Sequence, residues 1–376
     1  MGLSPWDVIT FLPRAGIFAS SLGAAVILSP LRSRDHGKTL GEHIERHIFR
    51  TACNIFSVDQ IQAVLPPTEA VYRAHNKKLG EPVVVVDLPN TTIKGVWLGN
   101  RNTATDYLVY FHGGGFVIPA VDQHFALLQR IVNWSGGKIA IFVPAYNLSP
   151  NVRYPQPIRE AAEAVKYVAG LAASESATKG KKKKGLSIAG DSAGGNLVVA
   201  ILSLLAGHGT DDLAPLQLPA TDDDALPPLK SAVAIAPWVS SDYNKFPQMV
   251  PAGNVDILSY KALDYFSLVY KGAGTKDDNF IVPELADPSW WEPVKGKVGS
   301  VLVLAGDNEV LRDPIVSWYA KFERAFGKES SRLLVAQNEV HDQLLTPKSE
   351  AELAVVGDGE TQEGALKRWA EKLSEE

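Results

Sequence analysis

Two patterns of apolar positions alternate along most of the chain. Short apolar runs, each followed by a polar or glycine-rich turn, are typical of buried strands. Between them, apolar side chains recur every three or four positions over stretches such as residues 158–173, which predicts helices packed by one face. Strands that alternate with helices predict a mainly parallel central sheet with helices on both faces, an α/β fold. The predicted strands lie within residues 82–88, 92–98, 107–111, 138–144, 185–190, 231–236, 300–306 and 332–336.

Two regions depart from this alternation. Residues 31–80 are polar, basic in places and helical in their periodicity, and they precede the first predicted strand. Residues 240–295 are long, irregular and rich in aromatic side chains, and they separate two predicted strands. An insertion of that length inside an α/β fold is typical of a lid or cap over a functional site.

The N-terminal residues 8–30 are mostly apolar. Pro13 and Arg14 interrupt the run and leave about 15 continuous apolar residues, whereas a transmembrane helix needs about 20. A secretory signal begins with basic residues, and Met1–Thr10 carries only Asp7 as a charged side chain. Several hypotheses stay open: a helix over the active site or on a membrane surface, a membrane anchor, a cleaved signal, and a contact between two copies in a homodimer.

Composition and charge narrow the class of protein. A chain of 376 residues with 45% hydrophobic and 21% charged residues is an ordinary globular chain, neither disordered nor a polytopic membrane protein. The net charge of −5 argues against nucleic acid as a partner. The single cysteine, Cys53, excludes an intramolecular disulfide framework and a cysteine-based zinc site, and fits a reducing compartment. We therefore expect a cytoplasmic protein, with association to the endoplasmic reticulum membrane left open.

A nucleophile motif follows the predicted strand that begins at residue 185. The sequence from Gly190 to Gly194 reads G-D-S-A-G and opens a helical stretch, which is the strand–turn–helix context of a nucleophile elbow. Glycines on both sides let strand and helix approach closely while Ser192 takes a strained conformation. The helix that starts here also favours negative charge at its N-terminus. Ser192 is the candidate nucleophile.

A glycine loop about 80 residues upstream complements this motif. The segment from His112 to Phe116 reads H-G-G-G-F at the end of a predicted strand. Glycines there free backbone N–H groups to point at one oxygen atom, and the amide that follows a nucleophile does the same. We expect an oxyanion hole formed by the amides of Gly114, Gly115 and Ala193, with His112 fixing the loop.

The serine needs a base, and the base needs a carboxylate that orients it. In proteins with this elbow the acid and then the histidine follow the serine along the chain. Of the two later histidines, His208 lies at the far end of the helix that starts at Ser192, so His341 is the predicted base. The acid is left open among three carboxylates in the segment 307–313.

The pair H-G-G-G-F and G-D-S-A-G-G-N resembles the hormone-sensitive-lipase-like family of α/β-hydrolases, over about residues 80–345. The family's D-x-L-x-D motif falls on residues 309–313, which implies Glu309 as the triad acid, with Glu in place of Asp. Asp307 is the alternative, and Asp313 would be the second acidic position. The long N-terminus is more similar to fungal steryl-acetate-hydrolase and secondary-metabolism members than to compact bacterial esterases.

The resemblance implies an α/β-hydrolase fold with a helical cap. The cap would comprise an N-terminal segment, residues 1–75, and the insertion at about 240–295 within a catalytic domain of residues 76–376. The expected reaction is cleavage of carboxylic esters of a lipophilic small molecule through an acyl-enzyme on Ser192, without a metal or organic cofactor. Four aromatic residues that follow strand ends are candidate pocket walls: Phe116, Tyr146, Trp238 and Tyr243.

Two rival hypotheses accompany this one. A biosynthetic acyltransferase, thioesterase or cyclase would use the same triad and pass the acyl group to an acceptor other than water. A receptor on an inactive hydrolase scaffold, similar to the plant gibberellin receptors, is more remote because those lack the catalytic histidine and His341 is present here.

Overall fold

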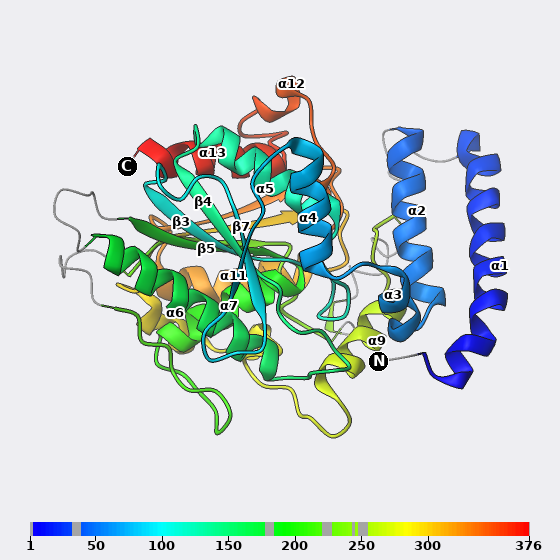
Figure 1. The fold of residues 1–376 in the computed structure, drawn as a ribbon, viewed down its shortest axis with the longest axis horizontal. Coiled ribbons are helices and arrows are strands. Elements are labelled where there is room, and N and C mark those ends of the chain that lie inside the picture. Colours follow the sequence, from blue (N-terminus) through cyan, green and yellow to red (C-terminus); the bar gives the residue numbers. More distant parts are fainter. Residues whose placement is uncertain are drawn as a thin grey trace.

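In the computed structural model, the chain folds around one mostly parallel sheet (Figure 1). The structure describes residues 3–31, 39–176, 184–219, 228–242, 245–246 and 255–375. In these residues the sheet has eight strands in the order β1-β2-β4-β3-β5-β6-β7-β8. The strands are β1 (Val84–Asp87), β2 (Lys94–Leu98), β3 (Asp106–Phe111), β4 (Ile139–Pro144), β5 (Gly185–Asp191), β6 (Leu229–Ile235), β7 (Val298–Gly306) and β8 (Ser331–Ala336).

The predicted α/β architecture is confirmed. β1 and β2 pair antiparallel around a turn at Asn90, whose φ is 59°, and β2 pairs antiparallel with β4. From β4 to β8 every neighbouring pair is parallel. The parallel strands are apolar over almost their whole length because helices cover the sheet on both faces.

The helices divide into those that cover the sheet and those that lie beside it. One face carries α6 (Gln156–Ser176), α7 (Ala193–Leu205) and α11 (Arg312–Phe326), and the other carries α4 (Thr68–Leu79), α5 (Asp122–Trp134) and α13 (Gln362–Glu375). Short helices α10 (Pro288–Trp291) and α12 (Glu350–Leu353) connect later segments. The strand β5 lies near the middle of the sheet, so the residue that follows it is held from both sides.

A group of helices stands at one side of the sheet (Figure 1). It contains α1 (Pro5–Leu28), α2 (Leu40–Ile55) and α3 (Val58–Val64), and α2 also contacts α9 (Tyr260–Lys271) of the insertion. By contrast α4 packs on α5 and β2 and buries Tyr72 in the core beneath the sheet. The sequence-based boundary between residues 75 and 76 therefore falls inside α4, which belongs to the body of the fold.

Helix α1 differs from the expectation that Pro13 interrupts the apolar run. It continues without a break through Pro13, since a proline removes only one backbone donor and the remaining hydrogen bonds hold the turn. Ser4 caps its start by accepting a hydrogen bond from the Asp7 amide at 3.1 Å. Together with the turn that follows, the segment Pro5–Leu31 of 27 residues is long and apolar enough to cross a membrane.

Candidate active site

Ser192 occupies a sharp turn between β5 and α7. Its backbone has φ 54° and ψ −116°, a conformation that an L-residue adopts only under constraint. Two hydrogen bonds supply the constraint, because the Ser192 amide donates to the Ile235 carbonyl at 2.8 Å and the Ser192 carbonyl accepts from the Trp238 amide at 3.0 Å. The elbow predicted from sequence is therefore present, with Ser192 at the start of α7.

The glycines of this turn are required by close backbone approach. A Cβ added at Gly194 would lie 1.9 Å from the carbonyl oxygen of Phe111, and one at Gly190 would lie 2.5 Å from the carbonyl oxygen of Gly194. Both distances are far below a van der Waals contact. The strand and the helix can meet at this angle only without side chains at these positions.

The glycine loop after β3 lies against the same turn. Gly114 and Gly115 have φ values of 109° and 60°, which favour glycine. The Gly114 carbonyl accepts from the Ile118 amide at 2.8 Å and fixes the curl of the loop. Gly115 is closed in by Phe266 of α9, since an added Cβ would lie 2.6 Å from its ring. Gly114, Gly115 and Ser192 line one cavity.

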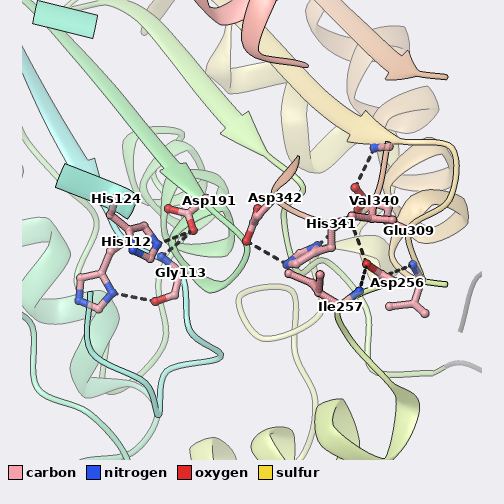
Figure 2. Close-up of polar contacts among 12 residues, drawn as sticks. His112, Gly113, His124, Asp191, Asp256, Ile257, Glu309, Val340, His341 and Asp342 are labelled. Atoms are coloured by element: carbon pink, nitrogen blue, oxygen red, sulfur yellow. Dashed lines mark hydrogen bonds and ion pairs between the residues drawn. The ribbon is translucent and has the colours of Figure 1, made fainter. Parts of the chain in front are cut away.

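Asp191, directly before the serine, holds the glycine loop in place. Its Oδ2 accepts from the Gly113 amide at 2.9 Å and lies 3.1 Å from His124 Nε2 (Figure 2). Its Oδ1 accepts from the Tyr110 hydroxyl at 2.6 Å. Burial favours the neutral acid, but the neighbouring His124 outweighs it and holds the pKa of Asp191 below its usual value. The amide of Gly113 is thus committed to Asp191, which leaves the next two amides for a ligand.

His112 fixes the loop from the other side, as expected. Its Nδ1 lies 2.7 Å from the Gly113 carbonyl oxygen, and its ring stacks on Tyr146 with centroids 4.4 Å apart. Burial lowers the pKa of His112 to about 4, so the ring is neutral at pH 7. His112 is therefore a support of the loop, with no charge of its own at neutral pH.

His341 reaches the site from the loop after β8. Its Nδ1 lies 3.7 Å from Oε1 of Glu309, and the other carboxylate oxygen of Glu309 accepts from the Gly306 amide at 2.8 Å. Both side chains are buried. Asp307, the alternative acid, is half-buried and near the Asn338 and Glu339 backbone. Of the two candidate acids, Glu309 is the one that the structure brings to His341.

A second carboxylate lies at the other nitrogen of His341. Oδ2 of Asp342 is 3.2 Å from His341 Nε2 (Figure 2). Burial opposes a charge on His341, but the carboxylates of Asp342 and Glu309 outweigh it and raise the pKa of His341 well above its usual value. Asp342 was not singled out from the sequence, although its position directly after the predicted base was a signal.

Asp256 connects the insertion to the loops that carry Glu309 and His341. Its Oδ1 accepts from the His341 amide at 3.0 Å and the Ile257 amide at 2.7 Å, and its Oδ2 accepts from the Val310 amide at 2.8 Å (Figure 2). Arg50 of α2 donates to its backbone carbonyl at 2.8 Å. Burial raises the pKa of Asp256 to about 6. No sequence motif pointed to this residue.

A cavity of about 120 Å³ opens beside Ser192. Its walls come from the glycine loop, the histidine loop, α2, and the start of the α9 region, and they are mainly apolar. The charged side chains of α2 that border it are Glu42, Glu45 and Arg46. Both cap segments expected from the sequence, the N-terminal helices and the insertion, thus contribute to this cavity. Among the described residues, no group of three or more His, Cys, Asp or Glu is arranged to hold a metal ion.

The chain was compared with known proteins. Residues 108–345 match a protein family described by the α/β hydrolase fold. The match covers more than half of the chain. This chain belongs to the α/β-hydrolase family. Its resemblance to the hormone-sensitive-lipase-like branch is confirmed.

Named relatives of this hydrolase are esterases. It is 23% identical over 309 residues to a Schizosaccharomyces pombe protein named as a steryl acetyl hydrolase, covering 77% of this chain and 70% of the relative. It is 25% identical over 261 residues to an ethyl acetate hydrolase of Pseudomonas putida, covering 66% of this chain and 72% of the relative. The expected activity, hydrolysis of carboxylic esters, is thereby confirmed.

Solved structures agree on the fold. An esterase from Rhizomucor miehei superposes with a TM-score of 0.62 at 22% identity, over 85% of this chain and 91% of that one. The esterase of Pyrobaculum calidifontis gives 0.62 at 21% identity, over 88% and 97%. At these identities the likeness concerns the α/β-hydrolase architecture.

The predicted aromatic pocket walls that the structure describes lie outside the cavity beside Ser192. Phe116, Tyr146 and Trp238 are almost fully buried and do not border the cavity. Phe116 stacks on Tyr270 with centroids 3.8 Å apart, and the Tyr146 hydroxyl donates to the His112 carbonyl at 2.7 Å. They pack behind the glycine loop because a strand end points its side chains into the core as readily as into the cleft. Tyr243 lies outside the described residues.

His208 is remote from the site, as the sequence indicated. Its ring stacks on Trp290 with centroids 3.5 Å apart, and its Nε2 lies 2.7 Å from the Trp290 carbonyl oxygen. Asp313, the second acidic position of the resemblance, pairs with the neighbouring Arg312 at 2.8 Å. Neither side chain is among those that border the cavity.

Proposed function

We propose that Ser192 is the nucleophile of this ester hydrolase, with His341 as general base and Glu309 as the carboxylate that orients it. The observation that carries the proposal is the constrained turn at Ser192, with φ 54°, which opens into one cavity with Gly114, Gly115 and His341. The 3.7 Å between His341 Nδ1 and Glu309 Oε1 supports Glu309 over Asp307 as the acid.

The proposed reaction has two halves. Ser192 Oγ attacks the acyl carbon and its proton passes to His341 Nε2; the same proton then leaves with the alcohol as the ester C–O bond breaks. Water, deprotonated by His341, attacks the acyl-enzyme and releases the acid. The amides of Gly114, Gly115 and Ala193 bind the negative oxygen of both tetrahedral intermediates, and one such donor typically contributes about 3 kcal/mol.

The substrate we propose is an ester of a lipophilic small molecule. Support comes from the apolar side chains that border the cavity, such as Phe49, Leu258 and Phe266. The names of two relatives, a steryl acetyl hydrolase and an ethyl acetate hydrolase, both specify acetate esters. A small acyl group beside Ser192 and a bulkier apolar alcohol toward the cap would satisfy both observations.

Hydrolysis of p-nitrophenyl esters from acetyl to dodecanoyl tests the proposal, with Ser192→Ala and Glu309→Gln measured beside the wild type. We expect rapid release with the shortest acyl groups, loss of at least about 10⁴-fold in kcat for Ser192→Ala, and a smaller loss for Glu309→Gln. Asp307→Asn is the matched control for the acid. Full activity in Ser192→Ala would refute the proposal, and a larger loss in Asp307→Asn than in Glu309→Gln would refute the choice of acid.

An acyltransferase or cyclase would give a different result. Labelling of Ser192 by a fluorophosphonate together with almost no ester turnover would mean that the nucleophile is active and that its acceptor is not water. That outcome would replace hydrolysis by acyl transfer and leave the assignment of Ser192 intact.

We further propose that α1 rests on a membrane surface. Large apolar side chains along it are exposed, among them Trp6 at 67%, Ile9 at 67% and Leu12 at 78%. Its other side packs on the cap, where Phe11 and Phe18 contact the ring of Phe56. An apolar face of this size on a helix held to the protein by its opposite face is typical of interfacial binding, and it supports a peripheral contact with a membrane.

Co-sedimentation with phosphatidylcholine vesicles tests this contact. The full chain is expected to pellet with vesicles, and a chain that lacks residues 1–31 is expected to stay in solution while it retains ester hydrolysis. If the full chain instead forms dimers in solution and ignores vesicles, α1 is a contact between two copies. Pelleting by the truncated chain to the same extent would contradict a role for α1.

A further inference from the structure

Asp342 lies at the nitrogen of His341 that has to exchange a proton with Ser192. In the proposed triad Glu309 occupies the Nδ1 side of the ring, at 3.7 Å, and the Nε2 side belongs to the serine. Yet Asp342 Oδ2 is 3.2 Å from Nε2, and His341 and Asp342 expose only 2% and 8% of their side chains. The imidazole is therefore flanked by a buried carboxylate on each side.

The backbone at Asp342 explains this position. The residue has φ 50° and ψ 32°, the left-handed region that only a few per cent of non-glycine residues adopt. With the backbone in this conformation, the Asp342 carboxylate lies 3.2 Å from Nε2 of the residue before it. The following residue, Gln343, accepts a hydrogen bond from Arg46 of α2 at 2.7 Å, so the cap holds the turn from above.

We propose that Asp342 is a positioning residue that holds a proton on His341 Nε2 before substrate binds. His341 then cannot accept the proton of Ser192 until the pair of His341 and Asp342 loses a proton. The inference rests on the proposed function, because it presumes that His341 is the base. Burial raises the pKa of Asp342, but the adjacent His341 opposes this rise and favours the ion pair of carboxylate and imidazolium.

Other charged and titratable groups face this pair and do not substitute for Asp342. Among the described residues, only Asp342 and Glu309 have a carboxylate oxygen within ion-pair distance of the His341 ring nitrogens. Asp191 lies on the far side of Asp342 and is itself paired with His124. The remaining groups around the pair are Asp256 from the segment before α9, Tyr110 from β3, and Glu42, Glu45 and Arg46 from α2.

The proton balance follows from this geometry. In the charged resting form, Nδ1 and Nε2 of His341 both carry protons and neither can accept one from Ser192. Loss of the Nε2 proton to solvent gives the active form. During attack the proton of Ser192 Oγ moves to Nε2 as the bond to the acyl carbon forms, and Asp342 then stabilises the imidazolium together with Glu309 before the proton passes to the departing alcohol.

The pH dependence of Ser192 labelling by a fluorophosphonate tests this role on the full chain, with kcat/KM for p-nitrophenyl acetate as a second readout. For the wild type we expect the acid limb to have its midpoint above the ordinary histidine value of 6.5, because the flanking carboxylates of Asp342 and Glu309 favour the charged ring. In Asp342→Asn the midpoint should fall by about 1–3 pH units, which is the usual effect of one adjacent charge, and the rate at pH 6 should rise. The plateau at high pH should fall, because a less basic imidazole is a weaker general base.

Asp313→Asn is the matched control, since it makes the same change on a carboxylate that pairs with Arg312 and not with His341. Its acid limb should coincide with that of the wild type. A wild-type midpoint at or below 6.5 would overturn the proposal, and this measurement does not depend on the folding of any variant. An unshifted midpoint in folded Asp342→Asn would also overturn the role of Asp342. If Ser192→Ala is inactive in the same experiments, the proposed function still stands. Activity that survives in Ser192→Ala would instead remove the proposed function itself.

Discussion

Helices α7 and α1 are both built from apolar sequence, and the fold uses them in opposite ways. All residues of α7, from Ala193 to Leu205, are buried between the sheet and its neighbouring helices. In α1 only Asp7 and Ala25 are buried, although this helix is 24 residues long and strongly apolar. Helix α7 is held by contacts on every side, whereas α1 is held along one side and is open on its opposite side (Figure 1).

The difference shows what apolar sequence contributes in each place. In α7 burial is complete because the helix packs between the sheet and its neighbouring helices, and each buried large aliphatic side chain stabilises the fold by about 1.5–3 kcal/mol. This packing holds Ser192 rigidly at the first turn of the helix. The outer face of α1 does not stabilise the fold, because its side chains remain in solvent. Changes in α7 should therefore affect folding and catalysis together, and changes on the outer face of α1 should affect neither.

The largest expected effect is that of Gly194→Ala at the start of α7. The new Cβ would meet the carbonyl oxygen of Phe111 at 1.9 Å, so β3 and α7 have to separate and the turn at Ser192 has to move. We expect destabilisation of more than about 4 kcal/mol and a loss of more than about 100-fold in kcat/KM. Thermal unfolding measures the loss of stability, and ester hydrolysis measures the loss of kcat/KM. A variant with near wild-type activity would mean that the two elements are not in rigid contact.

Asp256→Ala tests the junction between the cap and the body. Three backbone amides lose their acceptor, the buried amides of Val310 and His341 and the partly buried amide of Ile257, while the cost of burying the carboxylate is removed. We expect a net destabilisation of about 3 kcal/mol and a clear loss of kcat, because both catalytic loops lose their common anchor. Denaturant unfolding measures the first. Asp264→Ala, at an exposed position of α9, should be nearly silent, and equal effects of the two variants would contradict the role of the junction.

The next effect in size is expected from Ile9→Asp, on the outer face of α1, and it concerns membrane binding. Ile9 is 67% exposed, so the free energy of unfolding and the hydrolysis of a soluble ester should stay as in the wild type. Binding to vesicles should weaken by about tenfold or more, because a charge replaces an apolar side chain at the lipid surface. Val316→Asp, at an apolar position of α11 that is 41% exposed, is the control and should bind vesicles as the wild type does. Loss of folding in Ile9→Asp would show that this face is covered in solution.

The smallest expected effect is a gain in stability from Gly16→Ala in α1. No atom lies within 4 Å of the position that its Cβ would take, so the methyl group fits without displacing anything. Alanine in a helix interior is preferred over glycine by about 0.5–1 kcal/mol. Denaturant unfolding should show a gain of that order at most, in contrast to the same substitution at Gly194. A loss of stability would mean that another chain or surface packs on α1 at this point.

The parts of the site that could be predicted are those defined by short segments. The elbow at Ser192 and the glycine loop each require particular residue types within about five positions, because the backbone conformation is local. His341 could be assigned because chain order and the end of a strand limit the choice. Glu309 was reached through the resemblance, and the structure places it, not Asp307, beside His341.

The residues that escaped prediction act over long distances in the sequence. Asp256 is 85 positions from His341, whose amide it accepts from, and 54 from Val310. Nothing in its neighbourhood distinguishes it from a surface aspartate. Phe116 and Trp238 follow strand ends next to the site, but neither side chain borders the cavity. Phe116 packs against the rings of Tyr146, Trp238 and Tyr270, which come from distant parts of the sequence.

The sequence by itself determined the order of strands and helices, the mostly parallel sheet, and the sharp turn at Ser192 with its glycine loop, and it pointed to His341 as the proposed base. These follow from periodicity and from backbone conformations that few residue types allow. The tertiary structure alone decided that Asp342 and Asp256 join Glu309 around His341, which side chains border the cavity, and that the apolar helix α1 runs through Pro13 with one face exposed. Those features depend on which distant segments come within a few ångströms of one another, and that is set by the packing of the whole chain.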